Sequence, residues 1–339
     1  MNFFQILSDI EKVDPEVYER LDSRRRVFKN MSGVGQKLAA AALPLFVGAV
    51  FNKAYAQTPS GLAVQDVLNF ALKLEYLEMY FYSQRATLTG ISTINATALT
   101  TIFTDEANHV TFLKTAIGAI SGATVFADPT LAAYDFSGGK GSQAGPFADW
   151  KVNPATYLAL AQSFEDTGVR AYKGAAPLSS IMANKTVLTA ALNIHSVEAR
   201  HASHIRSMRR AGVNSSTPSQ GVPVAPYNAQ PKSWISGTDN GGAAATYTAP
   251  VYGAGNNTGT AVYGNGTSSG VGTATGIGVT FPAEDNVTQG GVALSTTTSA
   301  NFSTFPTAAF SEAFDEGLDV GTVSTIARTF VVTGNTMFG

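Results

Sequence analysis

Four stretches of the chain have the apolar spacing of a buried helix and carry a glutamate on the same apolar face. Their apolar residues recur every three or four positions, which is the spacing of one face of an α-helix. The stretches are residues 62–86, 95–117, 154–174 and 185–211. The glutamates on their apolar faces are Glu75, Glu106, Glu165 and Glu198. This pattern predicts a mainly α protein built on a four-helix bundle with carboxylates in its interior.

The residues that follow these glutamates repeat in two halves of the chain. In each half one glutamate is followed by a tyrosine seven positions later, and the other by a histidine three positions later. The pairs are Glu75 and Tyr82, Glu106 and His109, Glu165 and Tyr172, and Glu198 and His201. Residues three apart lie on one helix face a turn apart, so each Glu–His pair can reach one site. The tyrosines, two turns away, are expected near the site rather than in it.

Four converging carboxylates need positive charge among them. An ionised carboxylate in an apolar interior costs several kcal/mol even after relaxation, and four of them also repel one another. The apolar faces carry no basic partner, and the titratable neighbours at helix spacing are His109 and His201. Two divalent ions would neutralise the carboxylates, and oxygen ligands with a few imidazoles suit iron or manganese better than zinc or copper. The alternative is a metal-free bundle whose carboxylates share protons.

The two Glu-x6-Tyr and two Glu-x2-His elements, one per helix, resemble the ferritin-like dimetal-carboxylate superfamily. That bundle supplies one Glu from each of two helices and a Glu-x-x-His from each of the other two. More narrowly, LNFALKLEYLEMYFY at residues 68–82 and a trailing C-terminal helix are similar to the desiccation-related ferritin-like proteins of bacteria and plants. The resemblance covers about 62–212 well and 319–331 loosely.

The resemblance implies a role for each matching residue. Bridging ligands would be Glu106 and Glu198, terminal ligands Glu75 and Glu165, and nitrogen ligands His109 and His201. Asp105, which precedes Glu106, matches a family aspartate that holds a ligand histidine from behind. The corresponding residue before Glu198 is Val197, so this support is expected to be asymmetric. Tyr82 and Tyr172 are expected to be core aromatics with a hydrogen bond, with a redox relay as the alternative.

Several neighbouring polar residues are expected to lie outside the predicted metal centre, which consists of the six ligands named above. Glu78 is offset by about 60° from the buried stripe, although it could replace Glu75 as the inward residue. His195 and His204 point away from Glu198 and are expected to be partly exposed or satisfied by hydrogen bonds. Asp166 is expected to be solvated or to support a ligand from behind.

Residues 1–56 have the order of an export signal of the twin-arginine type. The Arg24–Arg26 cluster with Phe28 precedes the apolar run Leu38–Val50, which is too short for a stable membrane span. Ala54-Tyr55-Ala56 then predicts cleavage before Gln57. We therefore expect a periplasmic or extracellular protein with no stable membrane span after processing. The alternative is an N-terminal amphipathic helix followed by a buried apolar helix.

The remaining chain divides by composition. The bundle is expected at 57–212, with a glycine-rich crossover at 118–152 that joins its second and third helices. Residues 213–310 are rich in Gly, Thr and Ser and predict an irregular or β-hairpin excursion, because Val251-Tyr252-Gly253 recurs as Val262-Tyr263-Gly264. A C-terminal helix within 311–339, capped by Asp319, is expected to pack back on the bundle. The excursion is a candidate surface for self-association or another partner.

Composition narrows the possible functions. The net charge of −2 carries no electrostatic footprint for nucleic acid, and the absence of cysteine excludes thiolate metal sites. We expect an exported protein with two iron or manganese ions that react with O₂ or peroxide, as a ferroxidase or in peroxide detoxification and stress protection. If it is an enzyme, it is a dimetal oxidoreductase. The alternative is a non-catalytic structural or surface-binding protein whose metal site is a clamp or is empty.

Overall fold

The computed structural model describes residues 63–211, 231–255, 260–262, 271–273, 281–294 and 307–339. Residues 57–289 and 306–339 form one compact unit, and residues 1–56 with 290–305 form another. The description below concerns the first unit. The predicted export signal, residues 1–56, lies outside the described residues.

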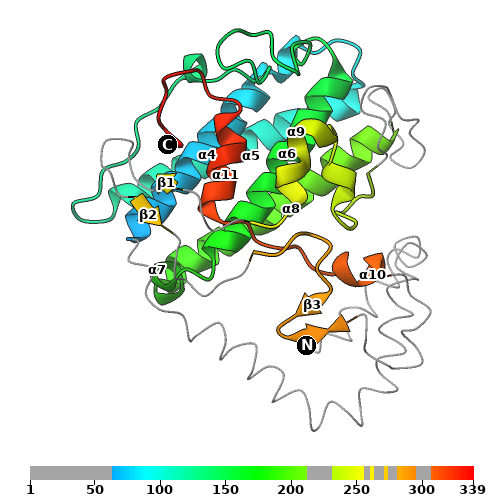
Figure 1. Ribbon diagram of the computed structural model, residues 1–339. Helices are drawn as coiled ribbons and strands as arrows, with labels where there is room; N and C mark the ends of the chain where they lie inside the picture. Colours follow the sequence, from blue (N-terminus) through cyan, green and yellow to red (C-terminus); the bar gives the residue numbers. More distant parts are fainter. Residues whose placement is uncertain (1–62, 212–230, 256–259, 263–270, 274–280, 295–306) are drawn as a thin grey trace, which may run out of the picture. The chain divides into compact units, whose positions relative to one another are not determined.

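Four long helices form the bundle, and the prediction of a mainly helical, ferritin-like fold is confirmed (Figure 1). They are α4 (Val64–Ser83), α5 (Thr93–Gly118), α6 (Pro154–Ala175) and α8 (Lys185–Ala211). Helix α4 packs along α5, and α6 packs along α8. Each pair is antiparallel. In the first pair, Arg85 just after α4 donates to Thr100 near the start of α5. In the second pair, Arg206 near the end of α8 donates to Asp166 in the middle of α6.

A long crossover joins α5 to α6, as predicted. It begins beside the start of α4, where the Asn69 side chain donates to the Thr124 carbonyl at 2.9 Å. It ends near the other end of α4, where the Tyr157 hydroxyl donates to the Phe81 carbonyl at 3.4 Å. The crossover contains η2 (Leu131–Ala133), and Tyr134 forms an antiparallel bridge with Val331.

Local signals explain where the helices begin. Asn153 accepts from the backbone N–H of Ala155, and Pro154 occupies the first helical position of α6. Ser92 caps α5 in the same way. Short elements fill the connections between the long helices: η1 (Gln84–Thr87) and α7 (Ser179–Ala183).

An aromatic cluster fixes α4 against α6 in the bundle interior. Phe81 stacks on Tyr157 with ring centroids 4.3 Å apart and meets Phe164 edge-on at 4.9 Å. All three rings are buried. Because Phe81 is locked in this cluster, the next residue, Tyr82, is held facing Glu165 on α6.

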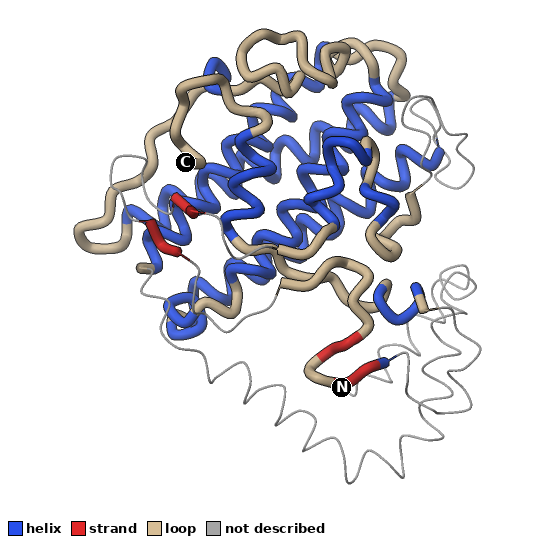
Figure 2. Tube along the Cα trace, viewed as in Figure 1, coloured by secondary structure: helices blue, strands red, loops and turns tan. Residues whose placement is uncertain are grey.

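Two helices of the chain after the bundle, α9 (Ala245–Tyr252) and α11 (Val320–Arg328), contact α6 (Figure 2). The other described elements of this unit are η3 (Asp239–Gly241), β1 (Thr260–Val262), β2 (Val271–Thr273), β3 (Thr288–Gln289) and α10 (Ala308–Ser311), while β4 (Val292–Ala293) belongs to the second unit. Strands β1 and β2 pair antiparallel, Thr260 opposite Thr273. The interpretation of the repeated Val-Tyr-Gly as paired strands is wrong, because Val251 and Tyr252 end helix α9. Both are buried, and the Tyr252 hydroxyl bonds Asp166, so tertiary contacts override the β preference.

The C-terminal helix α11 contacts α6. Its N-terminus is capped by Asp319, as predicted, through the backbone N–H of Thr322 at 3.0 Å. Just before it, the Leu318 N–H donates to the Arg170 carbonyl at 2.9 Å. A Cβ on Gly174 would lie 1.9 Å from the Leu318 carbonyl oxygen, so only glycine permits this close approach. Within the described residues, none of the helices is both long and apolar enough to span a membrane.

Candidate metal centre

The six predicted ligands lie together in the middle of the bundle, and all are buried. Within the described part of the chain, their side chains form two overlapping groups whose ligand atoms lie within 4.8 Å of one another. One group is Glu75, Glu106, His109 and Glu198, and the other is Glu106, Glu165, Glu198 and His201. Glu106 and Glu198 belong to both groups, so these two carboxylates lie where a bridging ligand would.

Each histidine directs Nδ1 at several carboxylate oxygens. His109 Nδ1 lies 3.0 Å from Glu106, 3.2 Å from Glu75 and 3.4 Å from Glu198. His201 Nδ1 lies 2.9 Å from Glu106 and 3.3 Å from Glu165. Two ligand atoms at about 2.1 Å from one ion and at right angles to each other are about 3.0 Å apart. The observed spacings, which are also those of hydrogen bonds and ion pairs, are compatible with a shared coordination sphere.

Several atoms of this centre are buried without a hydrogen bond among the described residues. They are Glu106 Oε1, Glu165 Oε2, both carboxylate oxygens of Glu198, and His201 Nδ1. All of them except Glu198 Oε2 lie 2.9–3.4 Å from an oppositely charged or imidazole partner in the ion pairs given above, so two histidines are shared among four carboxylates. Because these atoms converge on one place and are the donor types that iron and manganese accept, the residues could hold metal ions.

The charge balance of the centre shifts its pKa values in two directions. Burial, together with the charges of Glu165 and Glu75, raises the pKa of Glu106 to about 7. Burial and the Glu106 charge raise the pKa of Glu198 well above its usual value. The surrounding carboxylates outweigh burial and raise the pKa of both histidines, while His109 holds the pKa of Glu75 below its usual value. The metal-free centre therefore retains protons to compensate for its excess of carboxylates.

The two tyrosines hold the two carboxylates that belong to one group each. The Tyr172 hydroxyl donates to Glu75 Oε1, and the Tyr82 hydroxyl donates to Glu165 Oε1. Burial and the neighbouring carboxylate raise the pKa of both tyrosines well above the usual value, so they remain protonated donors. Each bond leaves Oε2 of its glutamate directed at a histidine.

Support behind the histidines differs between the two halves. Asp105 Oδ2 lies 3.0 Å from His201 Nε2 and fixes the ring with Nδ1 toward the centre. His109 has its contacts through Nδ1, and the residue that corresponds to Asp105 by the repeat is Val197. Gly168 of α6 leaves room for the Glu198 carboxylate, because a Cβ at this position would lie 2.9 Å from Glu198 Oε2.

Glu78 differs from its prediction. Its side chain is buried, at 5% exposure, rather than directed away from the bundle interior. It belongs to neither ligand group and makes no hydrogen bond or ion pair with the described residues. Burial and the charges of Glu198 and Glu106 raise its pKa well above the usual value. Glu78 is rotated by about 60° around the helix axis from Glu75, and this is too little to bring its side chain out of the interior. Helix α4 is enclosed on most of its circumference.

The two remaining histidines lie outside the centre, as predicted. The His195 ring is partly buried, and its Nδ1 lies 3.0 Å from the Val169 carbonyl oxygen. His204 is exposed.

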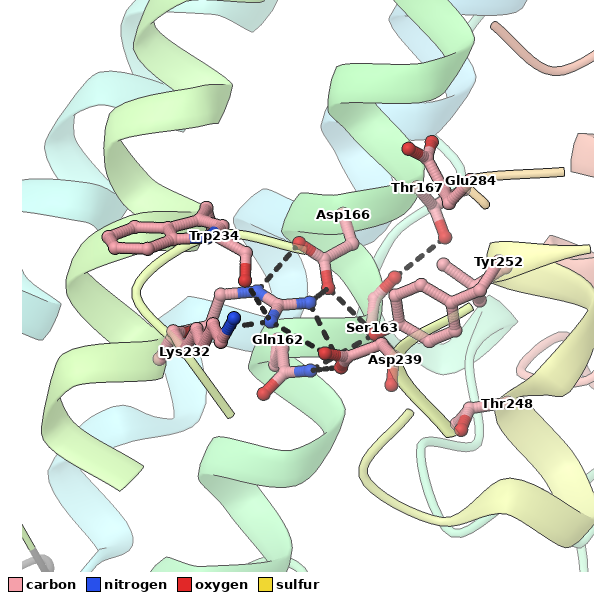
Figure 3. Close-up of polar contacts among 12 residues, drawn as sticks. Gln162, Ser163, Asp166, Thr167, Lys232, Trp234, Asp239, Thr248, Tyr252 and Glu284 are labelled. Atoms are coloured by element: carbon pink, nitrogen blue, oxygen red, sulfur yellow. Dashed lines mark hydrogen bonds and ion pairs between the residues drawn. The ribbon is translucent and has the colours of Figure 1, made fainter. Parts of the chain in front are cut away.

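Asp166 is not solvated, and it does not support a ligand. It is buried and paired with Arg206, whose Nη2 lies 2.6 Å from Asp166 Oδ2 and 3.1 Å from Asp239 Oδ2. The Tyr252 hydroxyl donates to Asp166 at 2.6 Å, and Gln162 donates to Asp239 at 3.0 Å. Figure 3 shows Gln162 and Asp166 of α6 facing Asp239 and Tyr252 of the chain after the bundle. We call these five residues the Arg206 network.

Arg170, one turn further along α6, is a second buried cation that the sequence analysis missed. Its Nε lies 2.8 Å from Glu284 Oε1, and its guanidinium donates to the carbonyls of Val251, Gly253 and Pro282. A signal was present in the sequence. Gln162, Asp166 and Arg170 recur every four residues and mark a polar stripe on a helix that is otherwise apolar.

The fold and the centre together define a helical-bundle protein with a buried carboxylate–histidine cluster that is compatible with a dimetal site. Residues 63–211 match the family model described as a ferritin-like domain, so this part of the chain is a ferritin-like domain. No curated protein and no solved structure gives a match. The narrower resemblance to desiccation-related proteins stays a prediction.

Proposed function

We propose that the centre binds two metal ions, iron or manganese, and that the loaded protein reacts with O₂ or peroxide. One observation carries the proposal: four buried carboxylates and two histidines converge in two groups that share Glu106 and Glu198. Each group offers three carboxylates and one imidazole. Two divalent cations would balance the four carboxylates, and this donor set favours iron or manganese.

The proposal assigns a task to each part of the centre. Glu106 and Glu198 would contact both ions, and each remaining glutamate and histidine would contact one. A redox-active metal pair supplies the electrons that O₂ or peroxide accepts. The chain's own residues orient the ligands: Tyr172 holds Glu75, Tyr82 holds Glu165, and Asp105 holds His201. Burial of all six ligands excludes bulk water from the centre.

Metal stoichiometry tests the first half of the proposal. The full chain loaded with iron or manganese should contain two ions by elemental analysis. Glu106→Ala and Glu198→Ala should each lose both ions, because each residue belongs to both groups. Glu78→Ala is the matched control, since it removes a buried glutamate that belongs to neither group. Full occupancy in either bridging variant contradicts the assignment.

Peroxide or O₂ consumption tests the second half. The reduced, metal-loaded protein should consume oxidant, with a change in absorbance that the Glu106→Ala variant lacks. A protein that holds two ions and consumes neither oxidant would instead use its metals as a structural clamp. A chain that binds no metal contradicts both functions.

We also propose that the chain is exported and cleaved before Gln57. The basic cluster, the apolar run and Ala54-Tyr55-Ala56 support this proposal, and a twin-arginine route would carry a folded, metal-loaded bundle. The intact mass of protein from the exported fraction should be short by residues 1–56. A full-length mass in that fraction would refute cleavage.

A further inference from the structure

Four consecutive residues that precede α9 have a left-handed backbone. Asp239, Asn240, Gly241 and Gly242 have φ angles of 53°, 52°, 83° and 82°. Glycine adopts this region freely, but asparagine and aspartate usually adopt it as single residues and not in succession. Asp239 and Asn240 therefore hold a strained conformation, and such a conformation persists only where the surrounding contacts enforce it.

The Arg206 network supplies contacts of this kind. The Arg206 guanidinium donates to both carboxylate oxygens of Asp239, at 3.1 Å each, and the Gln162 amide donates to Asp239 at 3.0 Å. Inside the turn, the Gly241 N–H donates to the Thr238 carbonyl at 3.0 Å. The bundle thus holds the turn through the side chain of Asp239.

Asn240 and Gly241 are two neighbouring residues that can react with each other. The Asn240 side chain is exposed and makes no hydrogen bond with the described residues, and Gly241 has no side chain to shield its own nitrogen. When Gly241 N attacks Asn240 Cγ, an N–C bond forms, the bond from Cγ to the amide nitrogen breaks, and this nitrogen leaves as ammonia. Water then opens the cyclic imide to aspartate or isoaspartate. The reaction uses water and a base, transfers no electrons, and replaces a neutral amide by a carboxylate.

The turn restrains this reaction in the folded chain. The attacking nitrogen must lose its proton and turn toward Asn240 Cγ, but its N–H is donated to the Thr238 carbonyl. The turn must therefore open first, and the ion pair between Asp239 and Arg206 resists that opening. Local opening has its own free energy, so the rate of the reaction should follow the fraction of time for which the turn is open.

We infer that Asn240 is a site of spontaneous deamidation, that the Arg206 network controls its rate, and that the product loosens the network. The new carboxylate lies next to Asp239 in the sequence, and an isoaspartate also lengthens the backbone of the turn by one methylene group. Both changes oppose the geometry in which Asp239 contacts Arg206. The chain after the bundle would then lose part of its attachment to α6 and α8 as the protein ages. The inference requires no metal and is independent of the proposed function.

The experiment incubates the full, metal-free chain at pH 8 and follows the peptide that contains Asn240 by mass spectrometry. The folded wild type should deamidate at least about tenfold more slowly than the same chain unfolded in guanidinium chloride, because the turn is mostly closed. Arg206→Met and Gln162→Leu each remove a contact to Asp239 and should accelerate the reaction in the folded chain, Arg206→Met more strongly. Arg200→Met, at an exposed position on the same helix, should leave the folded rate unchanged.

A second measurement tests the effect of the product. Chain that is purified after deamidation should unfold at a lower urea concentration than unreacted chain. Asn240→Asp should reproduce the part of this loss that comes from charge, because it adds the carboxylate without lengthening the backbone.

Each part of the inference can fail separately. No deamidation of Asn240 in the unfolded chain would overturn the site. Equal rates in the folded and unfolded wild type, or network variants that react no faster than Arg200→Met, would overturn control by the Arg206 network. Equal unfolding midpoints of the reacted and unreacted chains would overturn the loosening. Circular dichroism shows whether each variant is folded, and if Arg206→Met is not, Gln162→Leu decides the comparison.

Discussion

Two adjacent residues of α6, Glu165 and Asp166, belong to two polar clusters that differ in the cation which compensates their carboxylates. Asp166 lies in the Arg206 network, where the chain supplies its own cation and the guanidinium contacts both aspartates at 2.6–3.2 Å. Glu165 lies in the centre, where the ion pairs run to two histidines and several buried oxygens have no hydrogen bond among the described residues.

The difference between them distinguishes a structural cluster from a binding site. A buried carboxylate persists only where its charge is compensated, either by the chain or by a bound ion. In the Arg206 network the compensating cation belongs to the chain, and the network joins the chain after the bundle to α6 and α8. Arg206 donates to the carbonyl of Trp234, and Tyr252 at the end of α9 donates to Asp166. In the centre the compensation is incomplete, because two histidines are shared among four carboxylates. Excess carboxylate is therefore the feature that indicates an external cation.

The largest expected effect comes from removing the built-in cation. Arg206→Met would leave Asp166 and Asp239 buried without their partner, and breaking such a pair typically costs about 3–5 kcal/mol. We expect a loss of that size in the free energy of unfolding, measured by urea denaturation of the metal-free chain. Arg200→Met, an exposed position on the same helix, should change it by less than about 0.5 kcal/mol. Equal effects of the two substitutions would show that the Arg206 network is not a structural anchor.

Removing metal should give the next largest effect, and only at the centre. With free metal at 100 times Kd, binding adds about 2.7 kcal/mol, which is roughly 5–11 °C in Tm for a domain of this size. We expect the metal-loaded chain to melt higher than the metal-free chain by that amount at pH 7, by differential scanning calorimetry. In Glu106→Ala the two midpoints should coincide. Coincident midpoints in the wild type would contradict a metal-binding centre.

The sequence predicted the centre better than the network because the centre is local and repeated. Glu106–His109 and Glu198–His201 are short-range patterns on amphipathic helices, so helix geometry alone indicates that each pair shares a face. The Arg206 network joins residues 162 to 252, and its formation depends on how the chain after the bundle returns to α6. No periodicity reports such a contact. The burial of Glu78 was missed for a related reason, because α4 is covered on nearly all sides and not along one stripe.

Within the centre, His201 is supported by Asp105 whereas His109 has no corresponding aspartate, so the two proposed metal sites should differ in affinity. Asp105→Ala removes the acceptor on His201 Nε2, and loss of such support typically weakens metal affinity about 10–100-fold. Titration calorimetry with Mn²⁺ should show this loss in one of two binding steps. Val197→Asp would place an aspartate at the position that corresponds to Asp105, and it should increase the metal affinity of the second binding step. Equal weakening of both steps by Asp105→Ala would refute independent support of the two sites.

The smallest expected effect concerns Glu78, the buried carboxylate that has neither a built-in cation nor a place in a ligand group. Its pKa is raised well above the usual value, as is that of Glu198, while that of Glu106 is raised to about 7. The folded metal-free chain therefore binds more protons than the unfolded chain between the ordinary glutamate pKa and these raised values. Stability gained from this uptake is complete below the ordinary pKa and is lost as pH rises through the raised pKa values. The two histidines, whose pKa values are also raised, act in the same direction.

The metal-free chain should accordingly gain stability as pH falls from 8 to 5, whereas the metal-loaded chain should lose it because protons compete for the ligands. Glu75, whose pKa is lowered, opposes this trend only at pH values below the ordinary glutamate pKa, outside that window. Glu78→Gln removes the ionisable group while keeping the shape of the side chain, so it should stabilise the metal-free chain at pH 8 by about 1 kcal/mol or more. Because the pKa of Glu78 is raised, this difference should shrink as pH falls, and at pH 5 the variant and the wild type should unfold at nearly the same urea concentration. If the stabilisation is instead equal at both pH values, it comes from packing and not from charge. Loss of metal stoichiometry in the same variant would make Glu78 a ligand and extend the centre to a seventh residue.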